Sequence, residues 1–401
     1  YYFDILKYWN TVIYNLKPDI FVSYVIPHTP TCLSLYLLCK HHYNIDILFV
    51  DHNPLLDNHS YMISSSIENY ESISKIYKSK ENIIPGTDAI NYLKSIRKKD
   101  AKAPRAILED NKLFEKTSKI SYRIKQFCLI ILKTLIDGYG FKIDGDWKKK
   151  IKPYYNKNSR MNNFEEFFFI EKLKNKNKRL KKIYDRYVKK VDFSEKYIYF
   201  ASQYQPEASN SIVGGYYENF FLVLDILSSV IPNDWIIYYK ENPTTFSNSS
   251  LLKGSLRRNK YYYERLAQYK NIKMISEKIN TFDLIDHAQA VSTVTGTVAW
   301  EAVVRGVPAL IFGKIWYTGC DSIFSIKSFN DAVEAMNKII NGYKPDQKDI
   351  ERYTACIEKV ASKNILPIHN FDSNIKKQKN SEEALIKIAE YIYKFYINNR
   401  I

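Results

Sequence analysis

The sequence is poor in cysteine, and its cysteines do not pair. The five of them form no C-x-x-C motif: Cys32, Cys39, Cys128, Cys320 and Cys356. An odd and scattered set argues against a disulfide framework and against a zinc knuckle, and it fits a reducing compartment. We therefore expect a protein of a reducing compartment such as the cytoplasm.

Long apolar runs are also missing. The longest, residues 127–136, is interrupted by Lys133, whereas a membrane-spanning helix needs about 20 predominantly apolar residues. No secretory signal pattern opens the chain. We expect a protein that is soluble or bound to a membrane surface. Because the chain begins at Tyr1 and not at Met, we also expect that a first strand of the domain can precede it.

Negative charge is in deficit. The sequence has 43 Asp and Glu residues against 60 Lys and Arg residues, which gives a net charge of +17. This balance favours an anionic partner, such as a nucleotide, a nucleic acid, an acidic glycan or a phospholipid surface. Much of the excess lies in residues 148–190, which include KLKNKNKRLKKIYDRYVKK at 172–190. That segment is either a solvated Lys-rich helix or a basic face that contacts an anionic membrane or acceptor.

The 401 residues, 45% of them apolar, suffice for two domains. The first, residues 1–195, opens with a strand at 19–26, a helix at 30–42 and a strand at 45–50. This order predicts a βαβ unit with parallel strands. The rest of the domain, from about residue 60, has few Gly and Pro residues and is predicted to be a helical, Lys-rich insertion.

The second domain, residues 196–380, alternates strands and helices. Strands are predicted at 197–201, 235–239, 272–275, 290–292 and 308–312. This alternation is typical of a doubly wound, Rossmann-type domain. Residues 381–401 are predicted to form a terminal helix that packs back on the first domain.

Ligands of open α/β sheets bind at the carboxyl ends of the strands. In the first domain, that edge holds His28 and the pair Asp51 and His52. We expect one of them, His28 first, to bind an acceptor or to act as general base for its hydroxyl. Each of these histidines can also be an ordinary hydrogen-bonded loop residue.

The stretch 290–317, AVSTVTGTVAWEAVVRGVPALIFGKIWY, has the pattern of an anion cradle. A strand ends in hydroxyl residues and a glycine, and a helix follows whose first N–H groups attract a phosphate. A carboxylate one turn into this helix can reach a ribose diol. The candidates are Ser292, Thr293, Thr295, Gly296, Thr297 and Glu301.

Two further strand ends of this domain supply polar groups. The loop after residues 197–201 carries Glu207, a carboxylate that can act as nucleophile, general base or electrostatic stabiliser. The loop after residues 235–239 offers hydrogen-bond donors. The candidate binding residues in and after these loops are Gln203, Gln205, Lys240, Asn242, Pro243 and Arg257.

In this order, the three segments resemble the capsule polysaccharide biosynthesis family, which includes retaining β-Kdo transferases that use CMP-Kdo. The resemblance is good over residues 196–320, loose over 17–55 and absent from the basic middle of the chain. The matching motifs are Gln205-Pro206-Glu207, Gly214-Gly215, Lys240-Glu241-Asn242-Pro243 and Thr293-Val294-Thr295-Gly296-Thr297 with Trp300-Glu301.

The resemblance implies an α/β glycosyltransferase of GT-B type, with two Rossmann-type domains facing a cleft. It implies a CMP-activated ulosonic or nonulosonic sugar in the C-terminal domain, a glycan acceptor that can be lipid-linked, and no metal ion. Glu207 stands where the family's attacking carboxylate lies, so the resemblance implies a retaining reaction. The enzyme would work in the cytoplasm, with residues 148–190 as a peripheral contact to the inner face of the membrane.

Two departures point to a donor other than Kdo, such as pseudaminic or legionaminic acid. Asn242 stands where the family has a histidine, and Glu207 stands where the Kdo enzymes have an aspartate.

Other functions stay open. A UDP-sugar transferase, or a nonhydrolysing sugar-nucleotide epimerase, would use the same domain type, but an epimerase needs paired carboxylates and only Glu207 is clear. A nucleic-acid-binding protein would use the basic segment, although no recognised module surrounds it, so we expect no nucleic acid partner. Asp144-Gly145-Asp146 matches the D-x-D metal motif of another glycosyltransferase architecture, yet it is more simply a polar turn.

Overall fold

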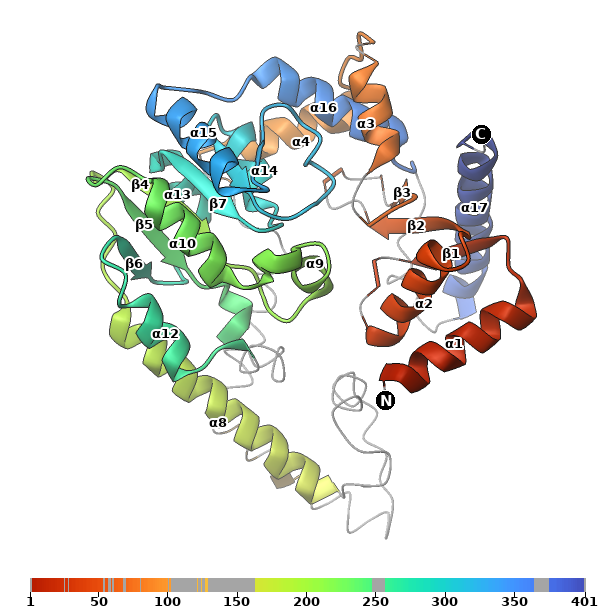
Figure 1. Ribbon diagram of the computed structural model, residues 1–401, viewed down its shortest axis with the longest axis horizontal. Helices are drawn as coiled ribbons and strands as arrows, with labels where there is room; N and C mark the ends of the chain where they lie inside the picture. The colour runs from red at the N-terminus through yellow and green to blue at the C-terminus, as the bar shows by residue number, and fades with distance from the viewer. Residues whose placement is uncertain are drawn as a thin grey trace. The chain divides into compact units, whose positions relative to one another are not determined.

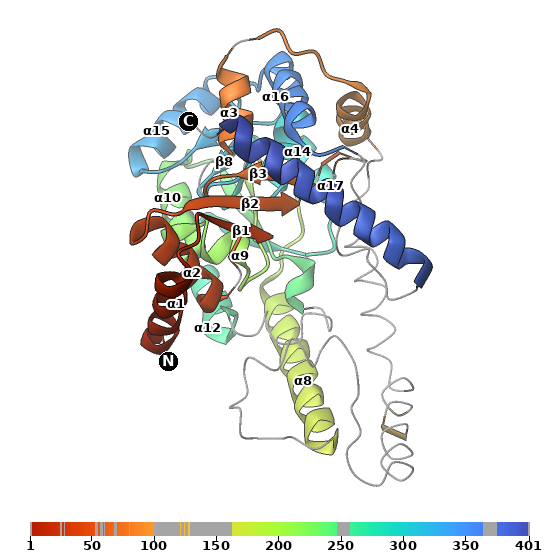
Figure 2. The ribbon, with the colours of Figure 1, turned by 90° about the vertical axis from the view of Figure 1, so that its right-hand side faces the viewer.

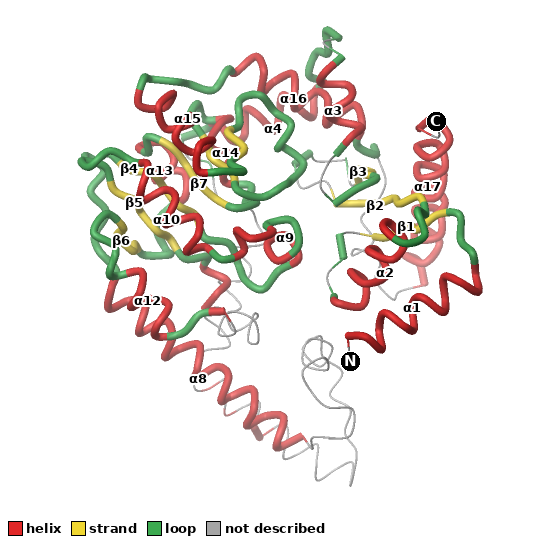
Figure 3. The backbone as a smooth tube through the Cα atoms, viewed as in Figure 1, coloured by secondary structure: helices red, strands yellow, loops and turns green. Residues whose placement is uncertain are grey.

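The chain folds into helices and mostly parallel strands, as the computed structural model shows (Figure 1). The sequence prediction of an α/β fold is confirmed. Figure 3 separates helices, strands and loops along the same trace. The structure describes residues 2–24, 26–27, 29–52, 55–56, 59, 61–67, 70–79, 81–99, 101, 121, 124, 127–128, 163–246, 257–363 and 375–399.

The chain forms two compact units, and each combines separate stretches of the sequence. Unit 1 contains Tyr1–Ala101, Glu207–Val230 and Ala288–Ile401. Unit 2 contains Lys102–Pro206 and Ile231–His287. The boundary at residues 195 and 196 remains a prediction from the sequence.

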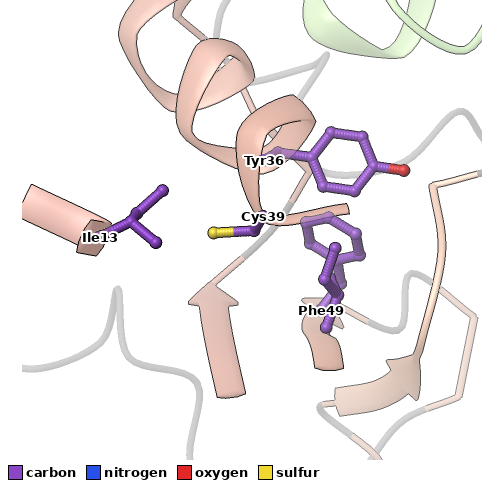
Figure 4. Packing of buried hydrophobic residues seen from close by; sticks show 5 residues of the cluster. Ile13, Tyr36, Cys39 and Phe49 are labelled. Atoms are coloured by element: carbon purple, nitrogen blue, oxygen red, sulfur yellow. The ribbon is translucent and has the colours of Figure 1, made fainter. Parts of the chain in front are cut away.

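Unit 1 begins with the βαβ arrangement that the sequence predicts. Strands β1 (Ile20–Tyr24) and β2 (Asp46–His52) run parallel and are joined by helix α2 (Pro30–His41). Strand β3 (Tyr61–Ser64), which was not predicted, pairs with β2 in the antiparallel direction. Helix α1 (Tyr2–Leu16) lies against α2. Figure 4 shows the core between these elements, which contains Ile13, Tyr36, Cys39, Ile47 and Phe49.

The last helix, α17 (Ile375–Asn399), packs on this small sheet (Figure 2). Ile388 is buried together with Val50 and Tyr61 of the strands. The hydroxyl of Tyr396 donates a hydrogen bond to Asp46 at 3.0 Å. The sheet and the C-terminal helix therefore share one apolar core.

Helices α3 (Glu71–Lys78) and α4 (Thr87–Arg97) pack on α16 (Gln347–Val360) in unit 1. The hydroxyl of Tyr77 donates to Asp349, and the guanidinium of Arg352 lies 4.1 Å from the ring centroid of Tyr77. Residues from the first quarter of the sequence are thus held by residues near its end.

The strands of residues 197–325 are parallel and almost entirely buried. In unit 2 the order is β6-β5-β4, and in unit 1 it is β7-β8-β9. The predicted strands at 197–201 and 272–275 are confirmed without change of bounds. The strands are β4 (Tyr197–Ala201), β5 (Ile236–Lys240), β6 (Ile272–Ile275), β7 (Ala290–Thr293), β8 (Ala309–Ile311) and β9 (Phe324–Ser325).

Helices connect and cover these strands. Short 3₁₀ turns occur at η2 (Gly215–Glu218) and η3 (Pro243–Phe246). The α-helices are α8 (Asn163–Tyr187), α9 (Ala208–Ser211), α10 (Phe220–Val230), α12 (Lys260–Leu266), α13 (Thr281–His287), α14 (Val298–Val304) and α15 (Phe329–Ile340).

Several sequence expectations fall on residues outside the described part of the chain. They concern His28, the Asp144-Gly145-Asp146 turn and residues 148–162 of the basic segment. No helix among the described residues is long and apolar enough to cross a membrane.

We predict that Glu358 is the N-terminal cap of α4. The N-cap residue of α4, Gly86, has no side chain that could cap the helix. The Glu358 carboxylate instead accepts hydrogen bonds from the N–H groups of Gly86 (2.7 Å), Asp88 (3.1 Å) and Ala89 (3.3 Å). Glu358→Ala should lower the free energy of unfolding by about 1–2 kcal/mol, as loss of a helix cap does. Chemical denaturation measures this loss, and Glu358→Gln, which keeps one acceptor oxygen, should recover part of it. Equal stability of Glu358→Ala and the native protein would contradict the assignment.

Candidate functional site

The end of β7 is buried, and the turn that follows it becomes exposed at Thr297. Ser292, Thr293 and Thr295 are buried, and the Ser292 Oγ has no hydrogen-bond partner among the described residues. Gly296 is half-buried and Thr297 is exposed. The part of the predicted cradle that faces solvent is therefore smaller than the sequence motif.

Aromatic side chains fix the position of this turn. The hydroxyl of Tyr317, a fully buried residue, donates to the carbonyl of Gly296 at 2.5 Å. The Tyr317 ring stacks on Trp300 of α14 with centroids 6.2 Å apart. Burial, with a smaller contribution from Glu301, raises the pKa of Tyr317 far above its usual range, so the phenol stays a donor.

Glu301 lies one turn into α14, where the sequence placed it. Its Oε1 is 3.4 Å from the Thr297 hydroxyl, which can donate to it. Glu301 is half-buried and Thr297 is exposed, so both are accessible at the same end of the helix.

The loop that carries Glu207 lies against this turn. Glu207 is exposed, and its carbonyl accepts from the N–H groups of Asn210 (3.0 Å) and Ser211 (2.8 Å), which starts α9. This loop ends at Gly214, where a Cβ would lie 3.0 Å from Val294 and 2.3 Å from the Asn210 carbonyl. Only glycine allows this approach, so unit 1 itself assembles the Glu207 loop and the predicted cradle.

The segment after β8 also lies against this turn and the Glu207 loop, and it was not predicted from the sequence. The Lys314 N–H donates to the Val213 carbonyl at 3.0 Å, and the Gly313 N–H donates to the Val294 carbonyl at 2.8 Å. A Cβ at Gly313 would meet the Thr295 methyl group at 2.4 Å. The Lys314 side chain is exposed, which adds a cation beside the cradle. The sequence signal for this part of the site was Gly313-Lys314, directly after the predicted strand at 308–312.

Of the candidate residues of unit 2, Lys240 and Gln205 are buried, whereas Asn242 and Pro243 are half-buried. Lys240 is buried, and its Nζ donates to the Ile279 carbonyl at 2.5 Å and to the Thr281 hydroxyl at 2.9 Å. The Asn242 Oδ1 accepts from the Thr244 N–H at 2.9 Å, an Asx turn that begins η3 at Pro243. Gln203 is half-buried and Arg257 is exposed.

The end of β5 is organised by a buried carboxylate, Glu241. Its Oε2 lies 2.8 Å from Nε of Arg258, and both side chains are almost fully buried. Arg258 Nη1 also donates to Oε1 of Gln205 at 2.7 Å. Four hydroxyl groups donate to the same carboxylate, from Ser202 (2.6 Å), Tyr239 (3.0 Å), Tyr263 (3.0 Å) and Thr245 (3.4 Å). We call Glu241, Arg258 and these donors, with Gln205, the Glu241 network.

The Glu241 network keeps its carboxylate charged. Burial on its own raises the pKa of Glu241, but Arg258 and the hydroxyl donors outweigh burial and hold that pKa below its usual range. Gln205 therefore has an internal partner, and the network fixes the loop that leads to Glu207. A Glu directly after an apolar strand, followed later by Arg257-Arg258, was the sequence signal for this network.

No group of three or more His, Cys, Asp and Glu side chains among the described residues is arranged to hold a metal ion.

The sequence model of the capsule polysaccharide biosynthesis protein family matches residues 149–321, less than half of the chain. The match confirms the resemblance read from the motifs. It also corrects one expectation, because it begins at residue 149 and includes the basic segment that the motifs left out. In the structure, buried Tyr184 of α8 packs on Phe246 and Tyr263, so this helix shares the core of unit 2. A search of curated protein sequences finds no match.

Solved structures with some likeness include members of two enzyme classes. UDP-GlcNAc 2-epimerase from Methanocaldococcus jannaschii is 15% identical over 89% of this chain and 82% of its own, with a TM-score of 0.29. KpsC, a beta Kdo 2,4 transferase from Thermosulfurimonas dismutans, is 13% identical over 84% and 78%, with a TM-score of 0.33. Likeness this weak supports no conclusion about function.

The Glu241 network predicts a large difference between two Glu→Gln substitutions. Glu241→Gln leaves Arg258 buried without its counter-charge and should cost about 3–5 kcal/mol. Glu264→Gln, which removes the half-buried partner of the exposed Lys260 (3.3 Å), should cost less than about 1 kcal/mol. Chemical denaturation of both variants measures the difference.

The contribution of Glu241 to the free energy of unfolding should decrease as the pH falls. Because the pKa of folded Glu241 lies below the ordinary value of 4.5, its contribution to stability is complete above that pH. It is lost as the pH falls through the lowered pKa, so the gap between native protein and Glu241→Gln should narrow in acid. A gap that is constant or widens in acid would contradict an ionised Glu241.

Proposed function

We propose that the protein is a glycosyltransferase of capsule or related surface-glycan synthesis. It moves an acidic ulosonic or nonulosonic sugar from a CMP-activated donor to a glycan acceptor, which can be lipid-linked, at the inner face of the membrane. The observation that carries the proposal is the assembly within unit 1 of the Glu207 loop, the 293–297 turn and Lys314. The family match over residues 149–321 covers all three segments.

In this proposal, Glu207 acts as the nucleophile. Its carboxylate attacks the anomeric carbon, the bond from that carbon to the phosphate oxygen breaks, and CMP leaves with the electron pair. The acceptor hydroxyl then displaces the carboxylate from the opposite face and gives its proton to a base, for which His28 is the candidate. Two displacements at one carbon retain its configuration.

The leaving phosphate needs stabilisation as its charge develops. The Thr297 hydroxyl, the backbone at Gly296 and the exposed Lys314 ammonium supply donors and positive charge for this purpose. Glu301 is placed to accept hydrogen bonds from the ribose. CMP carries a single phosphate, so these groups can stabilise it as a leaving group without a metal ion.

The proposal predicts that Glu207→Gln abolishes transfer and leaves CMP binding intact. Loss of a nucleophile should lower the rate by about a thousandfold or more. Glu334→Gln, at an exposed carboxylate of α15, is the matched control and should keep full activity. The assay is CMP release from CMP-Kdo and CMP-nonulosonic donors, together with CMP affinity. Full activity of Glu207→Gln would remove Glu207 from the chemistry.

Substitutions in the predicted cradle should weaken CMP binding itself, unlike Glu207→Gln. Thr297→Val and Gly296→Val should weaken CMP binding, because they remove a donor and crowd the backbone. A thermal-shift panel with CMP, UDP, GDP and ADP measures this, since a ligand that binds only the folded state raises the melting temperature. A shift with UDP and none with CMP would favour a UDP-sugar transferase or an epimerase. Unchanged CMP shifts in both variants would contradict the cradle.

A further inference from the structure

Helix α8 (Asn163–Tyr187) carries an exposed basic face. Its C-terminal half lies against α12 and η3, and its N-terminal half extends beyond them (Figures 1 and 2). Five exposed cations follow one another at steps of three or four residues, so they lie on one side of the helix. We call them the α8 stripe: Lys172, Lys176, Arg179, Lys182 and Arg186.

The α8 stripe differs from the flanks of the same helix. On the flanks, Lys174 pairs with Glu171 at 2.8 Å, and Lys181 pairs with Glu277 at 3.2 Å. None of the stripe cations forms an ion pair among the residues that the structure describes. A bland surface helix commonly mixes both signs of charge on its exposed face. On the flanks, Glu171 pairs with Lys174 and Asp185 pairs with Lys181.

The opposite side of α8 is anchored. Leu180 and Tyr184 are buried, and the Tyr184 hydroxyl donates to the Ile275 carbonyl and accepts from the Glu241 N–H at 3.1 Å. The helix therefore cannot rotate without breaking contacts of the Glu241 network. Its outward side is fixed, and the stripe extends about 21 Å at 1.5 Å per residue from Lys172 to Arg186.

An aromatic residue continues the stripe at its N-terminal end. Phe168 is 61% exposed and stands four residues before Lys172, on the same side of the helix. A straight row of cations that ends in an exposed Phe suits a flat anionic surface with an apolar layer beneath it. A soluble polyanion would use the cations and gain less from the Phe.

We propose that the α8 stripe docks the protein on an anionic lipid bilayer, with Phe168 inserted at the boundary between head groups and acyl chains. Cations near such a surface contribute about 1 kcal/mol each. Five of them with one aromatic anchor suffice for reversible peripheral binding. The docking is independent of the sugar donor and does not require that the proposed reaction be correct.

The test measures co-sedimentation of the intact protein with vesicles of phosphatidylcholine alone or mixed with phosphatidylglycerol. The triple variant Lys176→Gln, Arg179→Gln, Lys182→Gln should bind the anionic vesicles about a hundredfold more weakly, from about 1 kcal/mol for each cation. The matched control removes the same charge elsewhere in unit 2, with Lys196→Gln, Lys260→Gln and Lys270→Gln, and should bind nearly as the native protein does.

Two further measurements distinguish a lipid surface from a soluble polyanion as the partner of the α8 stripe. Phe168→Ser should weaken binding to anionic vesicles and leave binding to soluble heparin or DNA unchanged. Equal binding to neutral and anionic vesicles, or equal loss in the two triple variants, would overturn the proposal. Binding to heparin or DNA without binding to anionic vesicles would also overturn it, since the stripe would then serve a soluble polyanion. Thermal melting of each variant confirms that it is folded.

Discussion

The ion pair between Glu241 and Arg258 is the constraint on which unit 2 depends. A charged carboxylate without water must be surrounded by donors, and those donors come from segments far apart in the sequence. Ser202 follows β4, Tyr239 lies in β5, and Tyr263 lies in α12. The same guanidinium holds Gln205, so the requirements of a buried charge set the path of the chain just before Glu207.

The proposed site follows a division between fixed and accessible groups. Buried hydroxyl residues, glycines and aromatic rings shape the loops, while Glu207, Thr297 and Lys314 remain exposed on them. Rigid backbone with exposed polar tips is the arrangement that lets a site stabilise developing charge without rearranging. In unit 1 these loops are fixed by backbone hydrogen bonds, such as those from Gly313 and Lys314, and by the buried Tyr317 hydroxyl, which donates to the Gly296 carbonyl.

The sequence predicts well what depends on local patterns. Apolar runs bounded by polar loops gave β4 and β6 with their bounds, and the alternation gave the α/β fold. It predicts poorly what depends on distant partners. Strand β3 is short and pairs only because β2 offers an edge, and burial of Lys240 results from acceptors at Ile279 and Thr281. The motif showed hydroxyl residues at the end of β7 and after it, but only packing decides that Ser292 and Thr293 lie inside.

The contacts between α3, α4 and α16 have a consequence for how the protein is made. Tyr77 and Asp349, like Gly86 and Glu358, are separated by 272 positions in the sequence. A ribosome synthesises the chain from the N-terminus, so α3 and α4 leave it long before their partner exists. Closing contacts of such long range is slow. The packing of α3 and α4 on α16 can therefore be completed only after Val360 has left the ribosome.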